Sequence, residues 1–254
     1  MTLIAVGLLN LPVELLYEIQ LFALSENLPL VSHRFYDVFK NATSFFRAKY
    51  IFGRILSVSS HATVSDVYTK ALRYPMCNER ELEALHILTK DFPRNKSPVQ
   101  LARRFFRPLD VPGSGWTDDS HPLPLLRYVF DNPNIPPINP NVNKGYALVR
   151  AVHAKSIPLI QFLLDHGASP KCHENLAVVV AIRQKNLKLV KLLVERRDPQ
   201  KRAGKKRKLE DRMTLDAGLL KVAVQAGASD IVDYIYREKE VIPDVQTLKR
   251  MASA

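Results

Sequence analysis

The fold is decided by two stretches of the sequence that repeat one hydrophobic pattern. They read LVRAVHAKSIPLIQFLLDHGA at residues 148–168 and VVVAIRQKNLKLVKLLV at residues 178–194. In each, a short segment centred on an alanine, Ala151 or Ala181, precedes a longer segment with apolar residues at helical spacing. The copies are 30 residues apart. Each predicts a pair of helices that buries its apolar face only when a neighbouring pair stacks against it.

A third copy of the pattern lies further along the chain. Ala223-Val224 matches Ala181-Ile182 after 42 residues, because a segment rich in lysine and arginine intervenes at 196–212. We expect this segment to form an inserted loop. Upstream, 67–74 with 79–88 and 99–106 with 123–130 predict two further helix pairs with irregular connections. We therefore expect about five repeat-like units, where at least three are normally needed for a stable stack.

The period and the residue pattern of these units resemble ankyrin repeats. The resemblance implies a solenoid that presents loop tips and first-helix faces to a protein partner. One departure is that the family's Thr-Pro-Leu-His tetrad is missing, since its histidine position holds Val149, Val179 and Lys221 in the three copies. The usual tie between neighbouring loops is therefore not predicted.

The N-terminal segment has a different pattern. Apolar residues at helical spacing over 8–39 predict two short amphipathic helices, separated by the polar turn 25–27. Pro12 suits a first helical position, and the Asn10 side chain is a candidate cap. Because so small a pair cannot stand alone, its apolar surface must be buried against a later part of the chain or against a partner.

The residues of this segment, LPVELLYEI at 11–19 and LPLVSHRFYDV at 28–38, resemble the F-box family. In that family the Leu-Pro pair begins the first helix and the Leu-x-x-Val-Ser-x-x-Phe segment forms the second. The resemblance implies insertion into a Skp-type adaptor, which links to a cullin scaffold. Phe35 stands where a tryptophan is common. The adaptor contact would be carried by Leu11, Pro12, Leu15, Leu16, Ile19, Leu28, Val31 and Phe35.

Together these resemblances imply an all-α protein with N-terminal F-box helices followed by an ankyrin-like helical-repeat solenoid. The expected domains are an F-box at 1–42, a connecting helical segment at 43–62, and ankyrin-like repeats at 63–245 with the basic loop at 196–212. The expected function is that of a non-catalytic substrate receptor of a Skp/cullin/F-box ubiquitin ligase, acting in ubiquitin-dependent protein degradation. Two alternatives stay open: an ankyrin-like scaffold whose N-terminal helices only cap the array, and a basic nucleic-acid-binding protein.

Composition agrees with a helical protein. The chain has nine glycines against seventeen prolines, which suits helices with proline-bearing loops better than a glycine-rich sandwich. Cys77 and Cys172 show no paired spacing, so neither a disulfide framework nor a zinc site is predicted, and a reducing compartment is expected. The apolar start lacks the basic region of a signal peptide, and no apolar stretch is long enough to cross a bilayer. We expect a soluble protein without a membrane partner.

Much of the net charge of +12 is local. Residues 195–212 contain nine Lys or Arg against four acids, a net charge of +5. The cluster Lys205, Lys206, Arg207 and Lys208 resembles a nuclear-import signal, which implies an import receptor as partner and a location in the nucleus, the cytoplasm or both. Since no aromatic residues interleave with these cations, base stacking is not supported and nucleic acid is the less favoured partner.

No catalytic chemistry is predicted. The sequence contains no phosphate-binding glycine loop, His-Glu-x-x-His, Gly-x-Ser-x-Gly or paired Cys-x-x-Cys, so no catalytic residue, metal or cofactor is expected. Any ubiquitin transfer would be carried out by partners. Trp116, the only tryptophan, lies in a polar loop and is a candidate contact for the unknown target protein. The alternative is that its ring packs back onto the repeats.

Overall fold

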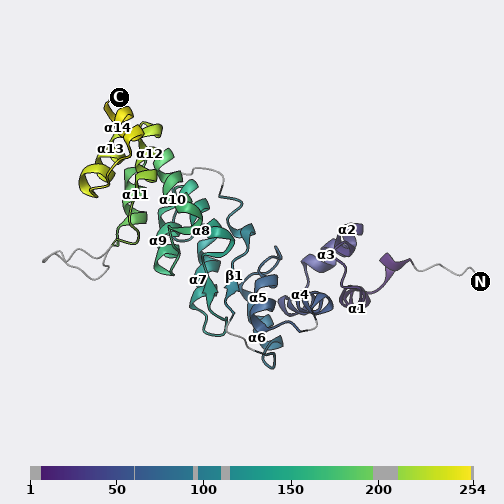
Figure 1. Cartoon of the computed structure of the whole chain (residues 1–254). Coiled ribbons are helices and arrows are strands. Elements are labelled where there is room, and N and C mark those ends of the chain that lie inside the picture. Colours follow the sequence, from purple (N-terminus) through teal and green to yellow (C-terminus); the bar gives the residue numbers. More distant parts are fainter. Residues whose placement is uncertain (1–6, 60, 94–96, 110–114, 197–210, 253–254) are drawn as a thin grey trace, which may run out of the picture. The chain divides into compact units, whose positions relative to one another are not determined.

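A computed structural model describes residues 7–59, 61–93, 97–109, 115–196 and 211–252. Over these residues the protein is 63% helix and 2% strand, so the all-α prediction is confirmed (Figure 1). No helix in these ranges is both long and apolar enough to cross a membrane. The contacts divide the chain into unit 1, residues 1–102 with 125–138, and unit 2, residues 103–124 with 139–254. This division falls inside the segment predicted to form one array.

Unit 1 begins with four short helical elements. The predicted second helix is split, because Ser32 is extended and its hydroxyl caps a new helix by accepting a hydrogen bond from the Phe35 N–H. The first helix begins one residue later than predicted, with Pro12 as its N-cap residue and no side-chain cap. The elements are the 3-10 helix Leu8–Asn10, α1 (Val13–Ala23), α2 (Leu28–Val31) and α3 (His33–Lys40).

The centre of unit 1 is α4 (Ser44–Val58), which occupies the predicted connecting segment. It contacts α1 on one side and both α5 (Val64–Ala71) and α6 (Glu79–Leu88) on the other. Tyr50 and Ile51 are buried along it, whereas Phe45 is half exposed. The predicted helix pair at 67–74 and 79–88 is confirmed by α5 and α6.

The helix predicted at 99–106 is wrong. Val99–Gln100 forms strand β1, which pairs with strand β2 (Ile138–Asn139). The Val99 N–H donates to the Pro137 carbonyl at 2.8 Å, and the Gln100 N–H donates to the Thr69 hydroxyl at 3.0 Å. Because these partners lie far away in the sequence, a local pattern does not predict them. A single 3-10 turn, Arg103–Phe105, follows the strand, and α7 (Leu123–Asp131) confirms the partner helix of this predicted pair.

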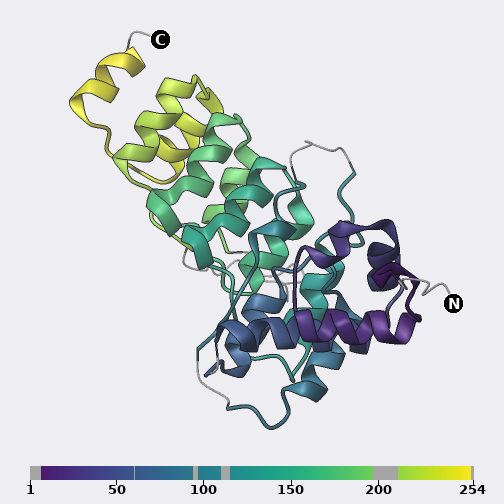
Figure 2. The same ribbon diagram turned by 90° about the vertical axis from the view of Figure 1, so that its right-hand side faces the viewer.

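Unit 2 contains the three helix pairs predicted from the repeated pattern. The first helices stack in a row, with α10 against both α8 and α12, and the second helices stack beside them, with α11 against α9 and α13 (Figures 1 and 2). The helices are α8 (Val142–His153), α9 (Ile157–Asp165), α10 (Cys172–Arg183), α11 (Leu187–Val194), α12 (Ala217–Ala226) and α13 (Ser229–Asp233). A π-helical turn, Tyr234–Glu238, continues α13, and α14 (Val245–Ala252) contacts α12.

The turn inside each pair has the same geometry. In each turn one residue adopts a left-handed conformation; these residues are Lys155, Lys185 and Gly227. The N–H of the next residue donates to a carbonyl five residues earlier, which gives a hydrogen-bond partner to a carbonyl at the end of the first helix. These bonds run from Ser156 to Ala151, from Asn186 to Ala181 and from Ala228 to Ala223, at 3.1, 3.2 and 3.2 Å. The repetition in sequence is thus also a repetition in hydrogen bonding.

The flanks of the basic insertion lie next to each other. The Arg212 N–H donates to the Val194 carbonyl at 2.7 Å, which joins the end of α11 to the residues that lead into α12. The Tyr234 hydroxyl and the Lys239 ammonium both approach Glu195, at 2.9 and 3.9 Å. The chain therefore returns to the same place in unit 2 after the insertion.

Candidate protein-interaction site

Helix α1 has two faces with different surroundings. Leu16 and Gln20 are buried within unit 1. Leu15 is 43% exposed and Phe22 is 86% exposed. Because Leu15, Ile19 and Phe22 are four and then three residues apart, they form one stripe along the helix. In the part of the chain that the structure describes, Leu15 and Phe22 are exposed and Ile19 between them is half-buried.

A shallow groove of about 510 Å³ follows this stripe. Glu18 supplies the charged side chain of the groove wall, and the rest of the wall is apolar. On α2, Leu30 and Val31 are 76% and 71% exposed. Such exposed apolar surface is typical of a binding site for another protein. The groove is lined by Leu11, Leu15, Glu18, Ile19, Phe22 and Ala23.

The inner face of α1 is fixed by polar contacts to α3. The Gln20 side-chain amide donates to the Phe35 carbonyl at 3.2 Å. The Arg34 guanidinium donates to the Leu11 carbonyl at 2.8 Å, at the start of α1. Both bonds join residues more than ten positions apart, so they hold the two helices in one arrangement. The open stripe is therefore presented by a helix with a fixed rotation about its axis.

Aromatic residues connect these helices to α4. The ring centroids of Tyr17 and Phe46 are 4.6 Å apart, and those of Phe39 and Tyr50 are 5.0 Å apart in an edge-to-face arrangement. The Tyr50 hydroxyl donates to the Ser25 carbonyl at 2.7 Å. Burial raises the pKa of Tyr50, against the opposing effect of the Arg54 charge, so the phenol keeps the proton that it donates. This cluster makes α4 the support of the N-terminal helices.

The eight residues expected at an adaptor contact fall into two groups. Leu16 and Phe35 are buried within unit 1, so in this conformation they support the helices. The other six are exposed or half-buried: Leu11, Pro12, Leu15, Ile19, Leu28 and Val31. Phe22 and Leu30, which are 86% and 76% exposed, were missed as contact residues. The helical spacing from Leu15 to Phe22 was the signal that could have found Phe22.

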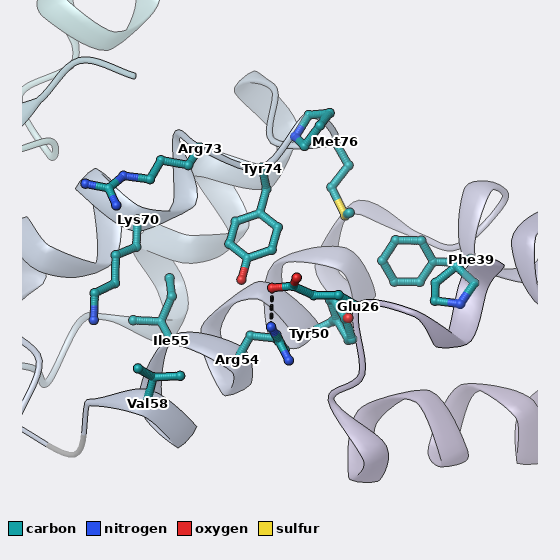
Figure 3. Close-up of a pocket in the computed structure, with 12 residues that line it drawn as sticks. Glu26, Phe39, Tyr50, Arg54, Ile55, Val58, Lys70, Arg73, Tyr74 and Met76 are labelled. Atoms are coloured by element: carbon teal, nitrogen blue, oxygen red, sulfur yellow. Dashed lines mark hydrogen bonds and ion pairs between the residues drawn. The ribbon is translucent and has the colours of Figure 1, made fainter. Parts of the chain in front are cut away.

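A second cavity in unit 1, of about 540 Å³, was also missed by sequence reasoning (Figure 3). It is bordered by residues of α2, α3 and α4 and by the segment from Lys70 to Met76. It shares no lining residue with the groove on α1. Apolar side chains dominate its wall, and Lys70 and Arg73 stand at its border (Figure 3).

Trp116 packs back onto unit 2. Its side chain is half-buried, and its indole N–H donates to the Ala154 carbonyl at 3.0 Å, at the end of α8. The polar atom of the ring is therefore used within the fold, as the alternative interpretation of this residue expected. A target contact at Trp116 would have to use the exposed part of the ring.

A tie between neighbouring loops of unit 2 is present, although the family's histidine is not. The Asn141 side chain donates to the Gly167 carbonyl at 3.0 Å and accepts from the Ser169 N–H at 2.7 Å. These bonds connect the loop before α8 to the loop before α10. Asn141 was missed by sequence reasoning, which looked for a tie at Val149 and its equivalents.

The remaining expectations concern charge and metals. Lys205, Lys206, Arg207 and Lys208 lie outside the described residues. Within the described ranges, no group of three His, Cys, Asp or Glu side chains could hold a metal ion. No family model, curated protein or solved structure matches the chain.

Proposed function

We propose that the protein is a non-catalytic substrate receptor of a Skp/cullin/F-box ubiquitin ligase, with α1 and α2 as the adaptor-binding helices. The observation that carries this proposal is the uncovered apolar stripe of Leu15, Ile19 and Phe22 on a helix whose sequence resembles an F-box. The resemblance implies a Skp-type adaptor as the partner, and the exposed stripe is the surface proposed to bind it. Ubiquitin transfer is the work of the partners.

The exposed stripe favours this proposal over the alternative of a simple cap. A cap would bury the apolar residues of α1 inside the chain, and burial contributes roughly 25 cal/mol per Å² of apolar surface. Phe22 of α1, and likewise Val31 of α2, instead expose most of their surface. Residues of this kind gain stabilisation only when a partner covers them.

The division of α1 into two faces assigns separate roles to its residues. Leu16 and Phe35 keep the helices in place, whereas Leu11, Leu15 and Ile19 face the groove. Phe22 is added to the proposed contact from α1, and Leu30 is added from α2. A substitution at Leu16 would disturb the fold itself, so it cannot test binding.

Unit 2 is proposed to be an ankyrin-like array that binds the target protein. Three features support this assignment: the stacked helix pairs, the repeated turn at Lys155, Lys185 and Gly227, and the loop tie through Asn141. A stack of this kind offers an extended surface for recognition. The cluster 205–208 is proposed to direct import into the nucleus.

The test is binding to a purified Skp-type adaptor. We expect the full chain to bind and the double variant Leu15→Asp, Phe22→Asp to bind at least about tenfold more weakly, since it buries two charges at the interface. Ile87→Asp, which changes another exposed apolar residue of unit 1, is the matched control and should bind normally. Circular dichroism of each variant checks the fold. Equal binding by all three proteins, or no binding by the parent, would contradict the proposal.

A further inference from the structure

The second cavity of unit 1 has the size and composition of a ligand site. Its volume of about 540 Å³ falls in the ordinary range of binding pockets, roughly 300–1,000 Å³. Phe39, Tyr50 and Ile55 form a buried apolar part of its wall, held in place by the aromatic contact between Phe39 and Tyr50. Val58, which is 78% exposed, and Met76 extend this apolar surface toward solvent.

The charge at the border of the cavity is positive. Arg54 and Glu26 form an ion pair, and Arg54 also donates to the Leu24 carbonyl at 2.5 Å, so these two charges are already paired (Figure 3). Lys70 is half-buried and Arg73 is exposed, and within the described ranges neither forms an ion pair. The cavity thus combines an apolar wall with two cations at its border, of which Lys70 also interacts electrostatically with Asp66 on the same helix.

We propose that this cavity binds an extended peptide segment of another protein, with a large apolar side chain flanked by acidic residues. The apolar side chain fills the space against Phe39 and Ile55, as buried anchors do at protein interfaces. Carboxylates of the flanking residues pair with Lys70 and Arg73. The proposal goes beyond adaptor recruitment and does not depend on it, because the peptide is bound by the chain alone.

The composition of the wall decides the class of partner. A nucleic acid binds through several phosphate contacts and stacks its bases on exposed aromatic rings. Here Phe39 and Tyr50 are buried, and two cations stand at the border. Ile55, Val58 and Met76 match an apolar side chain instead. A peptide is therefore the better fit.

The test measures fluorescence anisotropy of a short fluorescein-labelled peptide with a central tryptophan flanked by glutamates. A counterpart flanked by lysines and a single-stranded oligonucleotide are measured in parallel. We expect saturable binding of the acidic peptide that weakens with salt, and no comparable binding of the lysine peptide. The double variant Lys70→Glu, Arg73→Glu should weaken binding by about tenfold or more.

Two further variants separate the cavity from general charge. Val58→Asp, which adds a charge at an exposed position of the apolar wall, should weaken binding without unfolding the chain. Arg80→Glu, which reverses an exposed cation outside the cavity, should leave binding unchanged. The proposal is overturned if the acidic peptide does not bind or if Arg80→Glu weakens its binding as much as the double variant does. It is also overturned if the oligonucleotide binds at the cavity as tightly as the peptide.

Discussion

Gly145 is a position where the repeat geometry of unit 2 depends on the absence of a side chain. It is the last of three consecutive residues in a left-handed conformation at the start of α8, and 173–175 repeat this conformation thirty residues later. A Cβ on Gly145 would lie 2.7 Å from the Cβ of Cys172. Only glycine allows this approach of the two repeats at a positive φ without strain.

We therefore expect Gly145→Ala to lower the free energy of unfolding by roughly 1–3 kcal/mol, from backbone strain and overpacking. Urea denaturation measures the change. Gly218→Ala is the matched control, since Gly218 is exposed within α12 and an added Cβ there meets only the Asp216 side chain, at 3.2 Å. If both variants are as stable as the parent chain, the close approach of Gly145 and Cys172 is not a real constraint.

The buried carboxylate of Glu81 links the stability of unit 1 to pH. Arg47 donates to it at 2.6 and 3.0 Å, and the Asn78 N–H donates at 3.1 Å. Burial raises the pKa of Glu81, but the hydrogen bonds from Arg47, Asn78 and Ser44 outweigh this effect, and the pKa lies below its ordinary value. The stabilisation is present above the unfolded-state pKa of about 4.3 and is lost as the pH falls through the lower folded-state pKa.

In Glu81→Gln, the free energy of unfolding should therefore fall less steeply with acidification below about pH 4. Urea denaturation at a series of pH values measures this dependence. Glu79→Gln, on the exposed side of the same helix, should leave that slope unchanged. At neutral pH, Arg47→Met should cost about 3–5 kcal/mol, because it leaves an unpaired buried charge. A parental acid slope that persists in Glu81→Gln would show that other carboxylates cause it.

Among the helices and strands, the three stacked helix pairs of unit 2 could be predicted because their apolar residues recur locally. The period that relates Ala151 to Ala181 defines both helix pairs and the turn between them. By contrast, 99–106 became a strand and a 3-10 turn, since Val99 finds its backbone partner at Pro137. The sequence of α1 predicts an amphipathic helix, but Leu15 and Leu16 are adjacent and both are apolar. Which of them faces the core depends on where α3 and α4 pack.

The candidate site was predictable to the same extent. The motif identified α1 and α2, and it included Leu15 and Ile19, which line the groove. Phe22 was missed because it lies outside the motif segment, although it continues the helical stripe. The second cavity could not be predicted, because its wall comes from helices that are brought together only by the tertiary fold.

The inserted segment should be dispensable for folding. The flanking atoms, the Val194 carbonyl and the Arg212 N–H, are already 2.7 Å apart. Replacing 197–210 by a short glycine-serine linker should therefore change the melting temperature by no more than a few degrees, because loop closure depends only weakly on length. Thermal unfolding followed by circular dichroism measures this change. A large loss of helix would contradict the assignment of 196–212 as an inserted loop.

The same variant tests the import proposal. We expect a fluorescent fusion of the full chain to concentrate in the nucleus and the fusion without 197–210 to lose that concentration. A full-length chain with Lys205, Lys206, Arg207 and Lys208 replaced by alanine is the matched control, because it keeps the length of the loop. Nuclear concentration that survives both changes would exclude the cluster as the import signal.

In the whole molecule, the two compact units have separate proposed tasks. Unit 1 presents the apolar stripe of α1 and the cavity bordered by Lys70 and Arg73, and unit 2 presents stacked helix pairs. A receptor for a ubiquitin ligase needs one surface for the adaptor and a different one for the target. The groove and the cavity share no residue, so both can be tested in one chain by independent substitutions.

If a Skp-type adaptor covers the open stripe of α1, it should protect the backbone of that helix from solvent exchange. The most direct measurement is hydrogen–deuterium exchange of the full chain with and without saturating purified adaptor. We expect slower exchange of backbone amides in Val13–Ala23 and Leu28–Val31, with the amides of α8 to α12 unchanged. Unchanged exchange in α1, or protection confined to other helices, would contradict the proposed adaptor-binding role.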